Sequence, residues 1–267
     1  MGILNATPDS FSGDGIAHDE ASLLTRARAQ LEEGAGILDV GGESTRPGSV
    51  PVPLEVELRR VLPAIRVIAD ATSVPLSVDT SKPEVAEAAL RAGARIVNDV
   101  SGLADPRLAK VAADHGAHLV LVHNGWTLET RGIPDEGDAV DRVVREIERL
   151  ALVAQRSGVP REQLIADPGL GFGKTPDESL ALLARTTELC RRLAPMPLLV
   201  GPSRKGFIGH VLDLPTQERL EGTLACVAIA AFGGAAIIRV HDVRPAVRVS
   251  RLAWSLRAHA GAERATD

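Results

Sequence analysis

The sequence predicts an α/β protein, a single-domain (β/α)8 barrel with eight parallel strands. Short apolar runs alternate along the chain with longer segments of helical periodicity. The runs are continuously apolar, which is typical of parallel strands buried on both faces. Eight such pairs within 267 residues match the size of this barrel. A doubly wound open sheet is the less favoured alternative.

Eight segments carry the strand pattern. Each is a short aliphatic run bounded by glycine, proline or polar residues. Because only 2% of the residues are aromatic, the core that these runs form must be almost entirely aliphatic. The expected strands are Ile3-Leu4, 37–40, 76–78, 95–97, 118–122, 164–166, 197–200 and 235–240.

Eight helices are expected to follow these strands. Proline stands at or near the start of several, where a backbone N–H is not needed, and glycine follows most of their ends. The expected helices are 20–33, 53–71, 83–91, 106–115, 139–156, 177–193, 217–232 and 245–259. No linker divides them, so we expect one domain over residues 1–260 and a polar, frayed tail over 261–267.

Composition narrows the class of protein. The net charge is −5 and no basic block occurs, which argues against nucleic acid as the main partner. No apolar run approaches the length of a membrane span, and no signal peptide precedes the first strand. Cys190 and Cys226 each lie in an expected helix, which favours reduced thiols over a disulfide. We therefore expect a cytoplasmic protein that acts on small molecules.

Polar side chains stand where the expected strands end. Asp79, Asn98 and Asp167 follow or close apolar strands, and Lys205 closes the GPSRK turn. Sites in this fold lie at the carboxyl ends of the strands, and buried carboxylates and amides require polar partners. Any one of these residues could simply cap a helix or tie down a loop. The four together indicate a site for a flat heterocycle rich in N–H donors.

A second group of residues suits an anion. Arg239 and His241 are two positions apart in the last expected strand and therefore point to one side of it. Phosphate sites in this fold lie after strands 7 and 8, and Arg46 could add a forked donor. Asn5 ends the first strand. A neutral oxygen ligand suits Mg²⁺, although a loop-capping asparagine is the commoner role for such a residue.

Common nucleotide and hydrolase motifs are absent from the sequence. The GLGFGKT segment at 169–175 resembles a phosphate-binding loop, but its spacing would require glycine where Pro168 stands. No GxGxxG follows a strand, and no GxSxG or HExxH occurs. The chemistry must therefore come from the strand-end residues.

Seven ordered motifs resemble those of the dihydropteroate synthases and span nearly the whole chain. They are MGILNATPDSFS at 1–12, GGESTRPG at 41–48, SVDTSKPEV at 77–85, IVNDVSG at 96–102, DPGLGFGK at 167–174, GPSRKGFIG at 201–209 and IRVHDV at 238–243. The resemblance implies a (β/α)8 barrel, usually a homodimer. It also implies an enzyme that joins p-aminobenzoate to 6-hydroxymethyl-7,8-dihydropterin pyrophosphate with loss of pyrophosphate.

The resemblance also assigns residues to each substrate. The pterin would be held by Asp79, Asn98, Asp167 and Lys205. Pyrophosphate would be held by Asn5, Arg46, Arg239 and His241, with Asn5 also binding Mg²⁺. The p-aminobenzoate site would be formed by Phe11, Thr45, Pro47, Phe172 and Ser203. Catalysis would depend most on Arg46, Lys205, Arg239 and His241.

The chain departs from the family pattern in three places. Val122 and Asn124 flank His123 where the family usually carries methionines. Gly13-Asp14 stands in the first loop where Asp-Gly is usual, and the segment that ordinarily precedes the first strand is missing. These departures leave open a non-catalytic paralogue that binds a pterin.

A pterin-dependent methyltransferase on the related barrel is a further alternative, although GGESTRPG and SRK weigh against it. For a homodimer, the last two helices offer an apolar face around Leu224, Val227, Ala228 and Ala231.

Overall fold

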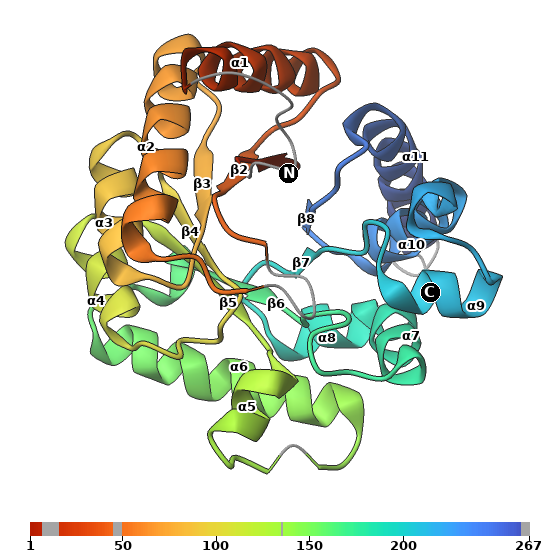
Figure 1. The fold of residues 1–267 in the computed structure, drawn as a ribbon. Coiled ribbons are helices and arrows are strands. Elements are labelled where there is room, and N and C mark those ends of the chain that lie inside the picture. Colours follow the sequence, from red (N-terminus) through yellow and green to blue (C-terminus); the bar gives the residue numbers. More distant parts are fainter. Residues whose placement is uncertain (7–15, 45–49, 135, 263–267) are drawn as a thin grey trace. The chain divides into compact units, whose positions relative to one another are not determined.

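The computed structural model describes residues 1–6, 16–44, 50–134 and 136–262. All eight expected strands are present in these ranges, although the last two are shorter than expected (Figure 1). The strands are β1 (Gly2–Asn5), β2 (Leu38–Gly41), β3 (Leu76–Asp79), β4 (Ile96–Asp99), β5 (His118–Val122), β6 (Leu164–Asp167), β7 (Leu199–Val200) and β8 (Ile237–Ile238).

The chain divides into two compact units, and the first comprises Met1–Leu121 and Leu150–Leu164. Strands β1 to β5 of this unit pair in parallel and in the order of the chain. Helices α1 (Ile16–Glu32), α2 (Leu54–Ala71), α3 (Pro83–Arg91) and α4 (Arg107–Asp114) pack side by side in the same order (Figure 1). A doubly wound sheet would reverse its strand order about the first strand, so the sequential order excludes that alternative.

Local sequence explains how these elements begin and end. Helix α3 has Pro83 as its first residue, where a missing backbone N–H is harmless. It ends before Gly93, which has a φ of +119° that side chains with a Cβ rarely adopt. A Cβ on this glycine would also lie 2.9 Å from Ala69 Cβ. The glycine therefore lets α3 pack closely against α2.

The second unit comprises Val122–Arg149 and Ile165–Asp267. In it, β6 meets the next segment through a parallel bridge between Ala166 and Leu198, and β7 pairs in parallel with β8. Its remaining helices are α5 (Gly125–Thr130), α7 (Pro176–Ala184), α8 (Thr186–Arg192), α9 (Gly206–Leu212), α10 (Leu220–Gly233) and α11 (Val243–Ala262). Helix α6 (Ala139–Arg156) has the predicted bounds and belongs to both units.

Several helix predictions were incomplete. The helix expected over 177–193 is interrupted at Arg185 and forms α7 and α8, and α10 begins at Leu220 after a short 3₁₀ turn. Helices α5 and α9 were missed because each is short and contains glycine, which lowers helix propensity. Helix α11 extends to Ala262, two residues into the expected tail, and residues 263–267 lie outside the described ranges.

The prediction of an apolar dimer face on the last two helices is wrong for some of its residues. Val227 and Ala231 are fully buried, because this side of α10 packs within its own unit, chiefly against α11. The exposed apolar residues of the two helices are others: Ile229 at 49%, Phe232 at 46% and Leu252 at 64% exposure. The periodicity identified an apolar helix but not which side of it faces the core.

Both cysteines are free thiols, as predicted. Burial raises the pKa of the Cys190 thiol and raises that of Cys226 to about 11, so both stay protonated at neutral pH.

None of the helices in the described ranges is both long and apolar enough to cross a bilayer.

A buried ionic cluster joins α2 to the end of β3. Glu57 is fully buried and accepts hydrogen bonds from Thr80 Oγ1 at 2.6 Å and Lys82 Nζ at 2.5 Å. The same Lys82 ammonium also pairs with Glu43. Burial lowers the pKa of Lys82, but the hydrogen bonds and charges of Glu43 and Glu57 outweigh it and raise the pKa. The cluster therefore neutralises a carboxylate that could not otherwise remain in the core.

Replacing Lys82 with methionine should destabilise the protein. The variant leaves Glu57 buried without its cation, which costs about 3 kcal/mol in comparable pairs. Lys110→Met is the matched control, because it removes an exposed pair with Asp114 and should barely change stability. Urea denaturation of both variants provides the measurement. Equal stability of the two would show that the cluster adds nothing.

Candidate functional site

In the first unit, three buried polar residues meet across neighbouring strands. Asp79 is the last residue of β3 and lies opposite Asn98 on β4. Asn98 Nδ2 donates to Asp39 Oδ2 on β2 at 3.0 Å. The exposed fraction of these residues is 6% or less. The predicted proximity of Asp79 and Asn98 is thus confirmed, and Asp39 emerges as the residue that orients the Asn98 amide.

Asn5 ends β1 in the same unit. It is half-buried, and its backbone carbonyl accepts a hydrogen bond from Arg26 Nη1 at 3.3 Å. Across the described ranges, no three His, Cys, Asp or Glu side chains gather as a metal site. A single neutral amide oxygen does fit a Mg²⁺ ion that is held mainly by phosphate oxygens and water.

In the second unit, Asp167 is a buried carboxylate among cations. Burial raises its pKa, although the hydrogen bond from Gly169 N–H, at 2.7 Å, and the charges of Lys205, Arg239 and Lys174 lower it. The burial effect is the larger one. An added ligand with N–H donors would satisfy this carboxylate where water cannot reach it.

The segment after β6 lies tightly against the end of β5. Gly169 has a φ of +65°, and a Cβ on it would lie 2.0 Å from the His123 carbonyl oxygen. His123 N–H in turn donates to the Asp167 carbonyl at 3.0 Å. Only glycine fits this position, which explains the glycine-rich sequence without any phosphate-binding loop.

Phe172 and Lys205 are in direct contact. The Lys205 ammonium lies 4.0 Å from the centroid of the Phe172 ring, a cation–π distance. Trp126 packs edge-on against the same ring, with centroids 5.9 Å apart. The residue expected to contact p-aminobenzoate therefore touches one expected to contact the pterin.

Ser203 and His241 form a hydrogen-bonded pair. The Ser203 hydroxyl lies 2.8 Å from His241 Nδ1 and accepts the His241 backbone N–H at 3.2 Å. When the Ser203 hydroxyl donates to Nδ1, a neutral His241 ring carries its own proton on Nε2. Nε2 is then a donor for an anion. Arg239 lies two residues away, just beyond β8, and its backbone N–H still pairs with Val200 at 3.0 Å.

Sequence reasoning missed a clip between the loops after β7 and β8. Arg204 makes a bidentate pair with Asp242, at 3.1 and 3.0 Å. Its carbonyl accepts from Arg219 Nη1 at 3.2 Å. Arg204 and Asp242 adjoin Lys205 and His241 in the chain, so the clip holds both functional side chains in register. Their position inside the GPSRK and IRVHDV motifs was the available signal.

The departures at Val122 and Asn124 have local explanations. Asn124 is the N-cap of α5, where its Oδ1 accepts from the backbone N–H groups of Trp126 and Thr127 at 3.1 and 3.3 Å. Methionine could not accept these bonds in the same way. Val122 is buried at the end of β5.

The remaining expected residues, Phe11, Thr45, Arg46 and Pro47, lie outside the described ranges. The Gly13-Asp14 departure lies outside them as well.

Comparison with known proteins then decides the family. The model of the pterin binding enzyme family matches residues 1–241 of this chain. The chain belongs to the pterin-binding enzyme family. The match includes β1 to β8 and every expected substrate-binding residue from Asn5 to His241.

Several relatives of this pterin-binding enzyme are similar to it over nearly their whole length. A curated dihydropteroate synthase of Synechocystis is 43% identical and covers 96% of this chain and 89% of its own. A solved dihydropteroate synthase of Clostridium difficile, in the presence of pteroic acid, has a TM-score of 0.89 and 37% identity, covering 96% and 95%. The solved dihydropteroate synthase of Xanthomonas albilineans, with 4-aminobenzoic acid, has a TM-score of 0.88 and 40% sequence identity. The match covers 96% of this chain and 92% of that one. The predicted barrel class is confirmed by these neighbours.

Replacing Asp167 with asparagine should stabilise the protein in a pH-dependent way. The folded pKa lies above the ordinary 3.8, so the carboxyl favours folding below that pH and loses this contribution as pH rises through the raised pKa. The difference in the free energy of unfolding between the variant and the wild type should therefore grow with pH and then level off. Denaturant titrations between about pH 4 and pH 8 measure it.

Asp105→Asn is the control of opposite sign. The hydrogen bond from Arg107 holds the pKa of this exposed carboxyl below 3.8, so its contribution is present at higher pH and lost on acidification. This variant should lose stability relative to wild type as pH rises. A gain of Asp167→Asn that is independent of pH would contradict the assignment.

Proposed function

We infer that this chain is a dihydropteroate synthase, which condenses 6-hydroxymethyl-7,8-dihydropterin pyrophosphate with p-aminobenzoate and releases pyrophosphate. The observation that carries the inference is full-length similarity to enzymes of that name, joined to a buried carboxylate among cations at the strand ends. The 4-aminobenzoic acid present with one solved relative is an expected substrate, and the pteroic acid present with the other is the oxidised form of the expected product.

The pterin is bound by four side chains in this proposal. Asp79, Asn98 and Asp167 would accept hydrogen bonds from the amino and ring N–H groups. Lys205 would donate to the pterin carbonyl or a ring nitrogen. Support comes from the burial of the three acceptors, each of which is 8% exposed or less, since buried acceptors favour a ligand rich in donors.

The reaction needs no nucleophile from the protein. The bond between the pterin methylene carbon and pyrophosphate oxygen breaks, and its electron pair leaves with the pyrophosphate. Positive charge on the methylene is shared with the ring until the p-aminobenzoate nitrogen forms the new bond and loses a proton to solvent. Arg239, His241 and Arg46 would stabilise the departing anion. The Nε2 donor of His241, set by Ser203, suits this role.

Mg²⁺ is proposed to bind at Asn5 and to neutralise charge on the pyrophosphate. Asn5 would supply one oxygen ligand, and the substrate phosphates and water would supply the others.

The p-aminobenzoate site is proposed to include Phe172 and Ser203 together with Phe11, Thr45 and Pro47. The aromatic ring of Phe172 would pack against that of the substrate. Because Lys205 lies over Phe172, both substrates would meet at one point.

We also propose one functional domain over residues 1–260 and a cytoplasmic homodimer. The exposed residues Ile229 and Phe232 on α10 and Leu252 on α11 support the pairing, since two helices that pack together each leave large apolar side chains on the surface.

Pyrophosphate release from the pterin substrate, measured with and without p-aminobenzoate, tests the proposal. Release should depend on p-aminobenzoate and yield 7,8-dihydropteroate in equal amount. Arg239→Ala and Lys205→Ala should each lower kcat/KM by about 10²- to 10³-fold, because each removes charge from the reacting groups.

Arg248→Ala removes an exposed arginine of α11 and serves as the matched control. Pterin binding by the wild type without turnover would contradict the synthase and favour the non-catalytic paralogue. Methyl transfer from methyltetrahydrofolate would instead favour the methyltransferase.

A further inference from the structure

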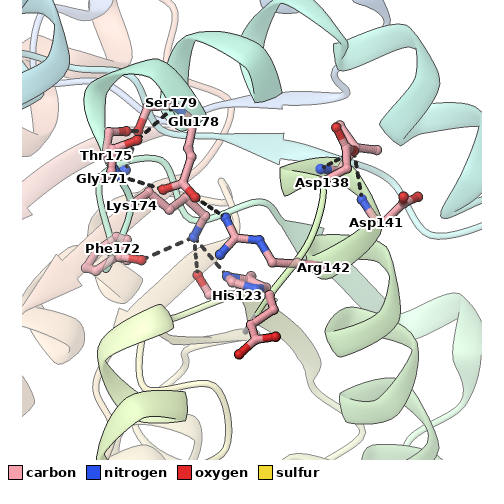
Figure 2. Close-up of polar contacts among 12 residues, drawn as sticks. His123, Asp138, Asp141, Arg142, Gly171, Phe172, Lys174, Thr175, Glu178 and Ser179 are labelled. Atoms are coloured by element: carbon pink, nitrogen blue, oxygen red, sulfur yellow. Dashed lines mark hydrogen bonds and ion pairs between the residues drawn. The ribbon is translucent and has the colours of Figure 1, made fainter. Parts of the chain in front are cut away.

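Lys174 is a half-buried lysine that the proposed reaction does not use. Its ammonium lies 2.8 Å from His123 Nδ1, 3.1 Å from the His123 carbonyl and 3.1 Å from the Phe172 carbonyl (Figure 2). An ammonium group has three N–H donors and no acceptor, so these three contacts can use all of them. Because an ammonium can only donate, His123 Nδ1 is the acceptor in the first of these contacts, and the His123 ring is fully buried.

The three contacts join the end of β5 to the segment that carries Phe172. His123 follows the last residue of β5, and its backbone is already fixed by Asp167. Lys174 therefore connects a rigid strand end to the Phe172 backbone, while Lys205 and Trp126 contact the ring of Phe172. The backbone anchor and the ring contacts together determine where the ring lies.

The next residues are held by a different set of bonds. Thr175 and Glu178 form a capping box at the start of α7, and Glu178 also pairs with the buried Arg142 of α6 (Figure 2). Ser179 accepts from Gly171 N–H at 3.3 Å. These bonds stabilise α7 and its entry. They do not include the Phe172 carbonyl, which accepts from Lys174 Nζ at 3.1 Å and from the Gly125 backbone N–H at 3.1 Å.

We propose that Lys174 is a positioning residue for the p-aminobenzoate subsite, acting through Phe172 without touching substrate. This inference rests on the proposed function. In this proposal, the tetrahedral ammonium of Lys174 holds the Phe172 backbone so that the Phe172 ring lies beneath Lys205. The loss of this anchor changes where p-aminobenzoate binds and leaves the hydrogen bonds to the pterin in place.

Lys174→Met tests the proposal by steady-state kinetics. The KM for p-aminobenzoate should rise between about 10- and 100-fold, the effect of a small misplacement, while pterin affinity by calorimetry changes less than about threefold. Lys174→Arg retains the charge near Asp167, but a planar guanidinium cannot match three tetrahedral contacts. It should therefore remain defective in KM.

Thr175→Ala is the matched neighbour control. It removes the cap of α7 and leaves all three acceptors of Lys174, so it should lower stability without raising the KM for p-aminobenzoate. An equal rise in KM in this variant would overturn the specific role of Lys174. Full recovery in Lys174→Arg would also overturn the proposal, because charge alone would then suffice.

A second readout does not depend on turnover. In a Trp254→Phe background, Trp126 is the remaining tryptophan, and its contact with Phe172 makes its fluorescence a reporter of the ring. Lys174→Met should shift this emission and Thr175→Ala should not. If Lys174→Met does not fold, Lys174→Gln, which keeps two donors, takes its place. Unchanged emission in a folded Lys174→Met variant overturns the proposal, even if the enzyme is active. If the wild type proves inactive but the variant still shifts the emission, the positioning role is supported and the proposed function fails.

Discussion

The buried carboxylate of Asp167 is the constraint on which the second unit depends. A carboxylate out of water is costly unless donors and cations surround it. Here one backbone N–H and three cationic side chains are near, and burial still raises the pKa above its ordinary value. Burial therefore still disfavours the charged form of this carboxylate in the protein alone, which favours a ligand that brings its own N–H donors.

Each of the cations near Asp167 has a second contact that fixes it. Lys174 is bonded to two carbonyl groups and a ring nitrogen, and Lys205 lies over Phe172. Arg239 follows β8 with its backbone N–H bonded to Val200. These contacts offset part of the repulsion among the three cations. They leave a preorganised surface for a substrate that carries both N–H donors and a pyrophosphate.

Much of this architecture could be predicted from the sequence. Largely apolar runs located all eight strands, because parallel strands buried on both faces carry few polar residues; buried Asp39 in β2 is an exception. The polar residue that ends each run then fell at the carboxyl end of its strand, as Asp79 and Asp167 do. Gly169 was recognised as part of a glycine-rich segment, but only the structure relates it to the His123 carbonyl.

What could not be predicted depends on contacts between distant residues. The clip between Arg204 and Asp242 spans 38 positions, and the bond from Lys174 to His123 spans 51. No periodicity encodes such pairs. Asn124 looked like a departure from a family pattern until α5 was seen to begin there. Val227 was assigned to the wrong side of α10, because an almost wholly apolar helix has no polar stripe to mark its exposed face.

Calorimetric titration of 6-hydroxymethyl-7,8-dihydropterin, in buffers of different ionisation enthalpy between about pH 5 and pH 7, tests the central claim most directly. If the pterin donates to Asp167, binding favours the carboxylate and lowers its pKa, so the wild type should release protons on binding. Asp167→Asn should bind far more weakly and release none. Equal affinity and equal proton release in the two proteins would contradict the account.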